Sequence, residues 1–298
     1  MHTKPRVAIL GVTGFIGHAL PQLFLEEGML CTGVSRSGKG DVRAVENWQT
    51  PDTLDLAGHH AVVNLAGESI AQRWNEKRKQ QFYESRIGVT KKIVEAIRRL
   101  PPEQRPKVLI NTSAVGIYGD RADETLTEEA PLGSGYLADL CREWEDAALE
   151  AEALGVRVVR LRIGIVLGRE GEAFKKLMRV FKLGIGGKLG SGMQWMPWIH
   201  VDDLRHAIVH SVLEESLQGP VNASAPWAER NVDFTRKLAS AVHRPAIFPV
   251  PGFALKIALG GFGGALLEGQ RVRPTALEAS GFRFVYPTLE SALADLVR

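Results

Sequence analysis

Short apolar runs alternate with amphipathic segments of helical length through the first half of the chain. The apolar runs lie at Val7–Leu10, Cys31–Ser35, Ala61–Gly67, Lys107–Ser113 and Gly155–Gly168. Uninterrupted runs of this length are typical of strands buried on both faces of a parallel sheet. The amphipathic segments predict helices over about Ile16–Glu27, over Glu76–Leu100 and from Tyr136 onward. Strands alternating with helices predict an α/β protein with a doubly wound parallel sheet.

The alternation breaks after Gly168. Ala173–Leu183 predicts a basic amphipathic helix, and the glycine- and aromatic-rich stretch Gly184–Trp198 predicts a mobile substrate loop. Further helices are predicted over Leu204–Leu213, from Asn231 and over Leu289–Val297. Asp202 and Asp203 are the expected caps of the first of these helices, and Asn231 that of the second.

Three glycines follow the first apolar run with a spacing of three residues. Gly11 permits a tight turn out of the strand, Gly14 lets the backbone approach a pyrophosphate, and Gly17 lets the following helix pack against the sheet. The helix N-terminus then presents free N–H groups to the phosphates. The alternative is an ordinary glycine-rich turn. Because these glycines lie between a predicted strand and a predicted helix, dinucleotide binding is favoured over that alternative.

The end of the second apolar run indicates which dinucleotide is bound. Proteins that bind NAD carry an acidic residue here for the ribose hydroxyl, whereas an arginine accommodates the 2′-phosphate of NADP. This chain has Ser35 and Arg36, and no acidic residue before Asp41. We therefore predict NADP(H), with Arg36 as the phosphate ligand and Ser35 as a hydroxyl donor; a solvated surface arginine is the alternative.

Composition narrows the class of protein. The 298 residues are 45% hydrophobic and 24% charged, and the net charge of +3 suggests no nucleic-acid partner. Two cysteines and a start that leads directly into a strand predict no disulfide framework, no signal peptide and a cytoplasmic location. The apolar stretch Phe253–Leu267 is interrupted by Lys256 and is too short to span a bilayer, so we expect no membrane partner. We expect no metal ligands, and the sequence predicts no particular oligomeric state.

The glycine spacing, with Thr13–Gly17 inside it, resembles the extended short-chain dehydrogenase/reductase superfamily, which contains sugar-nucleotide epimerases and dehydratases. Asn64–Gly67, Arg86–Thr90, Ser113–Gly119 and Trp198–Leu204 resemble further segments of that superfamily. The resemblance implies a Rossmann-type sheet. It also implies that Ser113 holds a substrate carbonyl or hydroxyl and that Tyr118 lines the substrate pocket. The cofactor-binding residues it implies are Gly11, Thr13, Gly14, Phe15, Ile16, Gly17, Ser35, Arg36, Asn64, Leu65, Ala66, Gly67, Arg86 and Arg162. The alternatives are that Tyr118 is half-buried for packing and that Arg162 pairs within the protein instead of facing the cleft.

The helix that begins near Tyr136 departs from the superfamily. Reductases of this type carry a tyrosine and a lysine one helical turn apart, and the lysine lowers the pKa of the tyrosine. Counting from Tyr136 puts Leu140 at the lysine position, whereas alignment on Glu145 puts Leu137 at the tyrosine and Cys141 at the lysine. Neither alignment gives the pair. Cys141 is either a substitute acid or thiol, or a small buried hydrophobe, and we favour burial.

The segment from Leu137 to Glu145, with Cys141 and Trp144 inside it, resembles the uncharacterised "epimerase family" branch, whose members add a short C-terminal domain of unknown function. We predict an NADP-binding Rossmann domain over 1–222, with a substrate-lobe excursion at about 170–198. A C-terminal cap lobe over 223–298 includes the unknown domain from about 249.

The leading functional hypothesis is an NADP(H)-binding, epimerase/dehydratase-like oxidoreductase acting on a small polar molecule. The alternative is a non-catalytic NADPH-binding regulator or sensor, which the missing tyrosine–lysine pair favours. Lys175, Lys176, Lys182 and Lys188 either attract an anionic substrate or form a solvated basic helix face. His200 invites an acid/base role, but a hydrogen-bonded structural histidine that links the two lobes is favoured.

Overall fold

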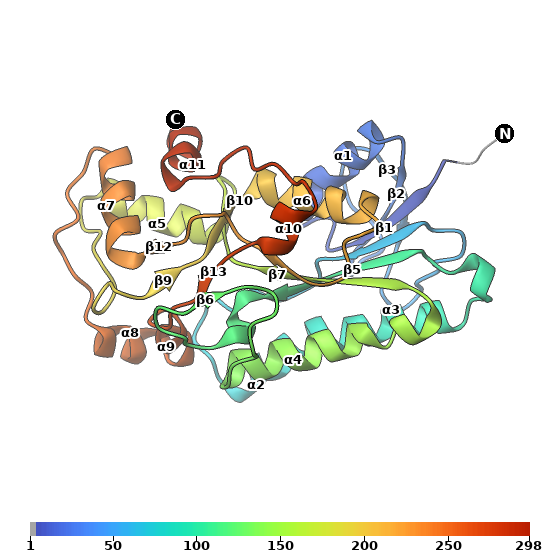
Figure 1. Ribbon diagram of the computed structural model, residues 1–298, viewed down its shortest axis with the longest axis horizontal. Helices are drawn as coiled ribbons and strands as arrows, with labels where there is room; N and C mark the ends of the chain where they lie inside the picture. The colour runs from blue at the N-terminus through green and yellow to red at the C-terminus, as the bar shows by residue number, and fades with distance from the viewer. Residues whose placement is uncertain (1–3) are drawn as a thin grey trace.

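The computed structural model describes residues 4–298 and is built around a seven-stranded parallel sheet (Figure 1). The strands lie in the order β11-β7-β5-β4-β1-β2-β3. Their bounds are Arg6–Leu10 (β1), Leu30–Val34 (β2), Val45–Gln49 (β3), Ala61–Asn64 (β4), Val108–Ala114 (β5), Arg157–Ile163 (β7) and Gly219–Ala223 (β11). From β1 the chain adds β2 and β3 toward one edge of the sheet, and from β4 it adds β5, β7 and β11 toward the other edge. The predicted doubly wound parallel sheet is therefore confirmed.

Helices cover both faces of this sheet. On one face, α1 (Leu20–Glu26) and α6 (Val201–Leu213) bury Phe24 and Ile208 against β1 and β5. On the other face, α3 (Val89–Arg98) and α4 (Tyr136–Leu149) bury Ile93 and Ala148. In Figure 1, α1 and α6 lie above the sheet and α3 and α4 lie below it. The two packed layers fix the carboxyl ends of the strands as one rigid edge.

Three predicted elements are divided in the structure. The first helix opens as a 3₁₀ turn at Gly17–Ala19 (η1) before α1 begins. The long helix predicted over 76–100 consists of α2 (Glu76–Tyr83), a π-helical turn at Glu84–Gly88 (η2) and α3. The long strand predicted over 155–168 breaks at Gly164 into β7 and β8 (Ile165–Leu167), because β8 leaves the main sheet to pair with β10 (Trp198–His200).

The strand β3 was not predicted from the sequence. Its sequence, VENWQ, is polar and half exposed, because β3 is an edge strand covered on one side only. Val45 and Trp48 turn inward and would contact a Cβ atom placed on Gly33. An edge strand of this kind lacks the apolar run that marks its buried neighbours.

The second lobe lies at the left of Figure 1. It contains α5 (Glu172–Lys182), α7 (Asn231–Ala241), α8 (Gly252–Leu259), α9 (Gly261–Ala265) and α11 (Leu289–Leu296). Its small sheets pair β9 (Trp195–Met196) with β12 (Glu229–Arg230) and β6 (Thr125–Leu126) with β13 (Arg271–Val272). The helix α10 (Thr275–Ala279) returns to β11, and short 3₁₀ turns occupy Pro102–Gln104 (η3), Val115–Tyr118 (η4) and Glu152–Leu154 (η5).

The glycine-rich segment 184–198 is tied to the C-terminal part of the lobe rather than lying free. Backbone hydrogen bonds join Val250 N to the Lys188 carbonyl at 2.9 Å and Gly190 N to the Val250 carbonyl at 2.8 Å. A Cβ atom on Gly187 would lie 1.9 Å from the Phe248 carbonyl oxygen, so only glycine fits this contact.

Two predicted helix caps are wrong. The cap of α6 is His200, whose Nδ1 accepts a hydrogen bond from Asp202 N at 3.2 Å. The Asp203 carboxylate instead accepts a hydrogen bond from Val285 N. The cap position of α7 is Arg230, and Asn231 uses its side-chain oxygen to accept from Leu189 N at 2.7 Å. Tertiary partners therefore override the local capping preference of Asp and Asn.

Candidate functional site

The glycine turn after β1 forms a backbone cradle. Gly11 has φ +76°, and a Cβ atom there would lie 2.9 Å from the Leu65 carbonyl oxygen. A Cβ atom on Gly17 would lie 2.4 Å from the Gly11 carbonyl oxygen, which explains why the turn needs glycine at both positions. Within residues 4–298, the backbone N–H groups of Thr13, Phe15 and Ile16 donate no hydrogen bond. The turn thus offers unpaired donors at a helix N-terminus and fits a pyrophosphate.

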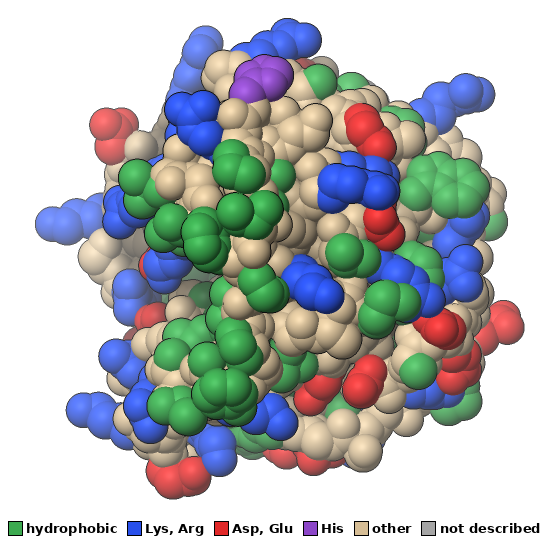
Figure 2. Space-filling model, turned by 90° about the vertical axis from the view of Figure 1, so that its left-hand side faces the viewer, with side chains coloured by type: hydrophobic (Ala, Val, Ile, Leu, Met, Phe, Trp, Pro, Cys, Tyr) green, Lys and Arg blue, Asp and Glu red, His purple; other side chains and the backbone are tan. Residues whose placement is uncertain are grey.

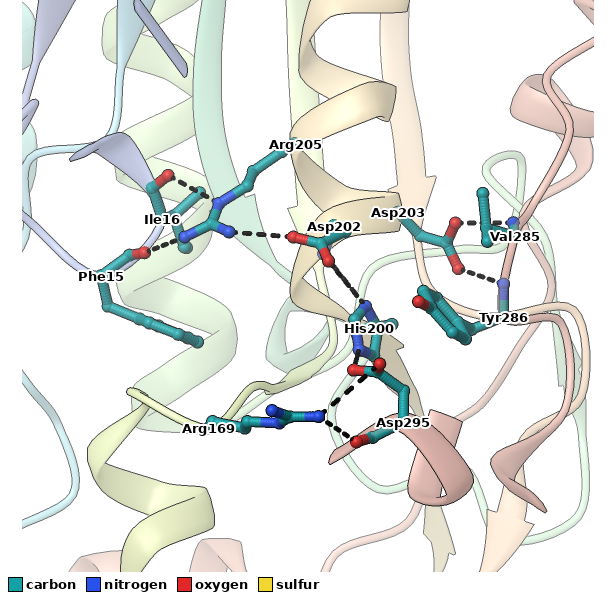
Figure 3. Close-up of polar contacts among 10 residues, drawn as sticks. All are labelled: Phe15, Ile16, Arg169, His200, Asp202, Asp203, Arg205, Val285, Tyr286 and Asp295. Atoms are coloured by element: carbon teal, nitrogen blue, oxygen red, sulfur yellow. Dashed lines mark hydrogen bonds and ion pairs between the residues drawn. The ribbon is translucent and has the colours of Figure 1, made fainter. Parts of the chain in front are cut away.

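Arg205 on α6 holds this turn from the other side (Figure 3). Its guanidinium donates to the carbonyl oxygens of Phe15 at 2.7 Å and Ile16 at 3.2 Å, and to the Asp202 carboxylate at 2.9 Å. The same group lies 6.0 Å from the centre of the Phe15 ring. Sequence reasoning missed Arg205, because 190 positions separate it from Phe15 and no local pattern links the two.

His200 joins α6 to the last helix of the chain. Its Nε2 faces the Asp295 carboxylate at 3.5 Å, and its ring stacks on Tyr286 with centroids 3.9 Å apart (Figure 3). Burial lowers the pKa of this imidazole, although three nearby aspartates oppose the shift. Asp203 accepts hydrogen bonds from the backbone N–H groups of Val285 and Tyr286. These contacts support the structural interpretation of His200.

Arg36 lies beyond β2 with its side chain 92% exposed. Its one ion-pair partner among the described residues is Glu68, at 3.2 Å, in the segment that follows β4. An exposed pair of this kind contributes little to stability, so the guanidinium is available to an anionic ligand. Ser35 is differently placed: its hydroxyl donates to the Lys39 carbonyl at 2.8 Å and accepts from Lys39 N. The expected role of Ser35 as a donor to the ligand is not seen, because its proton is already committed to a local turn.

The loop after β4 is shaped by buried hydrogen bonds. The Asn64 side chain is fully buried, donates to Asn111 Oδ1 at 2.7 Å and to Thr90 Oγ1 at 3.1 Å, and accepts from Ala66 N. Its amide therefore positions the loop formed by Leu65, Ala66 and Gly67, and does not point into open space. This loop packs against Gly11 and brings a second backbone wall to the cradle.

Arg86 reaches the same loop from the π-helical turn. Its guanidinium donates to the Glu68 carbonyl at 3.0 Å and lies 5.2 Å from the centre of the Trp144 ring. A Cβ atom on Gly67 would be 3.3 Å from its Cζ. Burial lowers the pKa of Arg86, and the nearby ionisable groups of Cys141, Tyr136 and Glu68 oppose that shift. A π-helical turn at this point redirects the side chain toward the loop, as such turns do at many functional sites.

Ser113 stands at the carboxyl end of β5 with 3% of its surface exposed. Its hydroxyl is buried and has no hydrogen-bond partner in the part of the chain that the structure describes. Buried hydroxyls are nearly always paired, so an orphaned one at the ligand-binding edge of a parallel sheet fits a substrate contact.

Cys141 lies beside Ser113 and supports the alignment made on Glu145. The thiol packs with Val115 and Ile117 below the end of β5, whereas Leu140 packs on the other side with Phe82. Burial and the Glu145 charge raise the pKa of Cys141 to about 11, although the Arg86 charge favours the thiolate. At neutral pH it is an un-ionised, buried thiol, as the burial interpretation requires.

Tyr118 and Arg162 are not where the resemblance places them. Tyr118 is fully buried, donates to Asn222 Oδ1 at 2.7 Å and accepts from Arg162 at 2.9 Å, so it does not line an open pocket. Arg162 is 3% exposed and makes two 2.9 Å hydrogen bonds to Glu145. Burial disfavours its charge, yet these bonds raise its pKa overall. Four of its five N–H donors bind Glu145, Tyr118 and the Glu128 carbonyl, so the arginine is paired inside the protein.

Tyr136 opens α4 next to an aromatic cluster. Its ring lies 5.1 Å from that of Trp74, and its hydroxyl is buried without a hydrogen-bond partner among residues 4–298. Burial raises the pKa of Tyr136, and the nearby Arg86 charge opposes that rise. Arg86, Tyr136, Cys141 and Ser113 thus form one neighbourhood between the β4 loop and the start of α4.

Two kinds of feature are absent from the described residues. No group of three or more His, Cys, Asp or Glu side chains among residues 4–298 could hold a metal ion. No helix in that range is long and apolar enough to cross a membrane.

Comparison with known proteins places the chain among named relatives. The model of the NAD dependent epimerase/dehydratase family matches residues 7–224, and a domain of unknown function, DUF1731, matches residues 250–296. A chloroplastic epimerase family protein SDR39U1 homolog of Arabidopsis thaliana is 39% identical over 98% of this chain and 86% of its own length. The epimerase family protein YfhF of Bacillus subtilis is 36% identical over 98% of this chain and 97% of its own length.

Solved structures give the same result. The crystal structure of human epimerase family protein SDR39U1 (isoform 2) with NADPH is 34% identical to this chain and has a TM-score of 0.88. The match covers 98% of this chain and 99% of the human chain. UDP-N-acetylglucosamine 4-epimerase from Bacillus cereus, at 15% identity and a TM-score of 0.74, shares the fold. The resemblance predicted from the sequence is therefore confirmed: this chain belongs to the NAD dependent epimerase/dehydratase family and, within it, to the epimerase family proteins that carry DUF1731 at the C-terminus.

Proposed function

We propose that this protein is an NADP(H)-dependent oxidoreductase of the epimerase/dehydratase type that acts on a small polar substrate. The observation that carries the proposal is the orphaned, buried hydroxyl of Ser113 at the same edge of the sheet as the unpaired backbone donors of the glycine cradle. A bound nicotinamide would supply hydride transfer, which the protein itself cannot perform. The two buried, unpaired cysteines suit a reducing compartment, so a cytoplasmic location is part of the proposal.

Arg36 supports NADP(H) over NAD(H). Its side chain is exposed and sits where a 2′-phosphate is recognised in such folds, and its partner Glu68 is held only by a solvent-exposed pair. The human relative was crystallised with NADPH. The cradle of Thr13, Phe15 and Ile16 would hold the pyrophosphate through its N–H groups.

Arg86 supplies a positive charge where the superfamily lysine is missing. Its guanidinium is close enough to Cys141 and Tyr136 to affect the pKa of both groups. A guanidinium stays protonated at neutral pH, so Arg86 can stabilise negative charge that develops on a substrate but cannot pass on a proton. Ser113 would donate a hydrogen bond to the substrate oxygen, and a substrate with an anionic group would suit this site.

The first test is calorimetric titration of the wild type and of Arg36→Ala with NADPH and with NADH. The wild type should bind NADPH more tightly. Arg36→Ala should weaken NADPH binding by about 1–3 kcal/mol, the scale of a lost charged hydrogen bond, and leave NADH binding nearly unchanged. Arg98→Ala, which removes another exposed, ion-paired arginine, is the matched control. Equal affinity of the wild type for both dinucleotides would contradict the NADP(H) assignment.

The second test screens small carbonyl and hydroxyl compounds for oxidation or reduction, followed through the absorbance of the reduced nicotinamide. With any substrate found, Ser113→Ala should lower turnover by about 10²–10⁴-fold, as for loss of a group that acts on the reacting atoms. Tyr136→Phe should keep turnover within a few-fold of the wild type. The reverse order would place the chemistry on Tyr136 and overturn the role given to Ser113.

A further inference from the structure

Exposed apolar side chains are concentrated in one part of the second lobe. Nine large hydrophobic side chains of the described chain are more than half exposed, and six of them lie in the segments 173–190 and 243–260. They are Leu183, Ile185, Ile247, Phe248, Phe253 and Ile257. Soluble monomers rarely gather apolar groups in this way unless the surface contacts something.

We name the two segments together the cap face, because backbone hydrogen bonds join them. Residues 186–190 pair with residues 248–250 through backbone hydrogen bonds. On α8, Phe253 and Ile257 point outward one helical turn apart, each 69% exposed, while Leu255 is buried. Figure 2 views this end of the molecule and shows hydrophobic side chains gathered in two clusters on its left, with Lys and Arg around them.

The cap face is also strongly basic. Segments 173–190 and 243–260 contain no Asp or Glu, and their seven cationic side chains are all exposed. These cations are Lys175, Lys176, Arg179, Lys182, Lys188, Arg244 and Lys256. Among the residues the structure describes, only Lys176 has an ion-pair partner, Glu172. The whole chain carries a net charge of only +3, so the cap face holds more positive charge than the molecule shows overall.

We propose that the cap face binds the surface of an anionic lipid bilayer. Exposed Phe, Leu and Ile side chains surrounded by Lys and Arg match the two requirements of peripheral lipid binding: apolar groups that enter the headgroup region and cations that attract anionic lipid. The sequence excluded a membrane partner because no segment could span a bilayer. A surface contact needs no span, so the proposal revises that expectation.

Charge argues against the other occupants. A symmetric contact between two copies of this face would bring seven cations of each chain against seven of the other. Five of the seven cations are lysines, and lysine is depleted in protein–protein interfaces. The lipid surface is therefore the occupant that the composition of the cap face favours.

Co-sedimentation with vesicles tests the proposal. The full chain should bind phosphatidylcholine vesicles that contain phosphatidylserine, should not bind vesicles of phosphatidylcholine alone, and should be released by salt. Replacing Lys182 and Lys188 together by Gln should weaken binding about fivefold per charge. Replacing Phe253 and Ile257 together by Ser should weaken binding at least about tenfold, because the apolar groups no longer enter the headgroup region.

Matched controls change the same residue types elsewhere. Lys77→Gln with Lys91→Gln removes two exposed lysines, and Trp227→Ser removes a side chain that is 57% exposed outside the cap face. Both controls should bind vesicles within twofold of the wild type. All variants should keep the wild-type melting temperature, which excludes unfolding as the cause of lost binding.

Three results would overturn the proposal. The wild type could ignore anionic vesicles, or the cap-face variants could bind them as tightly as the wild type does. Analytical ultracentrifugation could instead show that the wild type self-associates and that the Phe253 and Ile257 variant does not, which would make this face a contact between copies. Binding to poly-glutamate without binding to vesicles would assign the face to an acidic polypeptide.

Discussion

Removing Arg205 should loosen the glycine cradle. The Arg205 side chain is 11% exposed and makes two hydrogen bonds to carbonyl oxygens of the turn, at 2.7 and 3.2 Å. Hydrogen bonds to charged groups contribute about 1.5–3 kcal/mol each, and water can replace part of this at a half-exposed turn. We expect Arg205→Gln to cost about 2 kcal/mol in total.

That cost should appear in two measurements. The free turn becomes mobile, so a dinucleotide must order it on binding, and a loss of preorganisation worth about 1.4 kcal/mol weakens NADPH binding about tenfold. The rest of the cost of about 2 kcal/mol should lower the free energy of unfolding, which is measured by chemical denaturation without ligand. NADPH binding is measured by calorimetry. Asp202→Asn is the matched control, because it removes the ion pair at 2.9 Å but leaves both bonds from Arg205 to the turn.

The affinity measurement separates positioning from stability. Arg205→Lys should restore part of the NADPH affinity, since an ammonium can reach one carbonyl but not both. An affinity within twofold of the wild type in Arg205→Gln, with lower stability, would show that Arg205 supports only the fold. A loss of affinity as large in Asp202→Asn would show that the ion pair, rather than the bonds to the turn, carries the effect.

Further predictions concern the same cleft. Gly14→Val should abolish NADPH binding, and Gly17→Ala should lower the melting temperature, because its methyl group would lie 2.4 Å from a carbonyl oxygen. Glu68→Gln should tighten NADPH binding a few-fold by freeing Arg36 from its exposed pair, and weaker binding in calorimetry would contradict this. Burial lowers the pKa of His200 in the folded state, so the unfolded chain takes up the proton first as the pH falls. The stability contributed by the neutral His200 imidazole is complete above the unfolded pKa of about 6.5, and it is lost as the pH falls from there through the lower folded pKa. His200→Gln should therefore reduce the loss of unfolding free energy between neutral and mildly acidic pH, and an unchanged loss would refute the assignment.

Local patterns predicted the elements that are buried on both faces. The four apolar residues before Gly11, like the runs that became β4 and β5, carry their structure in consecutive residues. The strand β3 and the break at Gly164 lack such a signature. β3 exists because β2 offers a free edge, and Gly164 turns because Pro197 approaches within 2.8 Å of where a Cβ atom would be. Both depend on residues distant in sequence.

The candidate site also divides into features set by local sequence and features that depend on distant residues. The glycine turn was predicted from its own spacing, and it presents unpaired backbone donors. The role of Ser113 was implied by resemblance, and its hydroxyl is buried without a partner among residues 4–298. Tyr118 and Arg162 were assigned by resemblance, yet both belong to a buried network that includes Glu145 and Asn222. Motif position fixes where a residue lies on a strand, but whether its polar group meets a ligand or another side chain depends on packing across the sheet.

The charges around α4 limit the chemistry that this site can perform. In a tyrosine–lysine pair, the ammonium lowers the pKa of the tyrosine so that it can exchange a proton at neutral pH. Here the cation is Arg86, burial raises the pKa of Tyr136, and the Cys141 thiol has a pKa of about 11. None of these three groups changes its protonation readily near neutral pH. On the proposed function, Arg86 and Ser113 would stabilise charge on the substrate, and the proton would come from water or from the substrate itself. This favours substrates that carry their own ionisable group next to the reacting carbon over simple ketones.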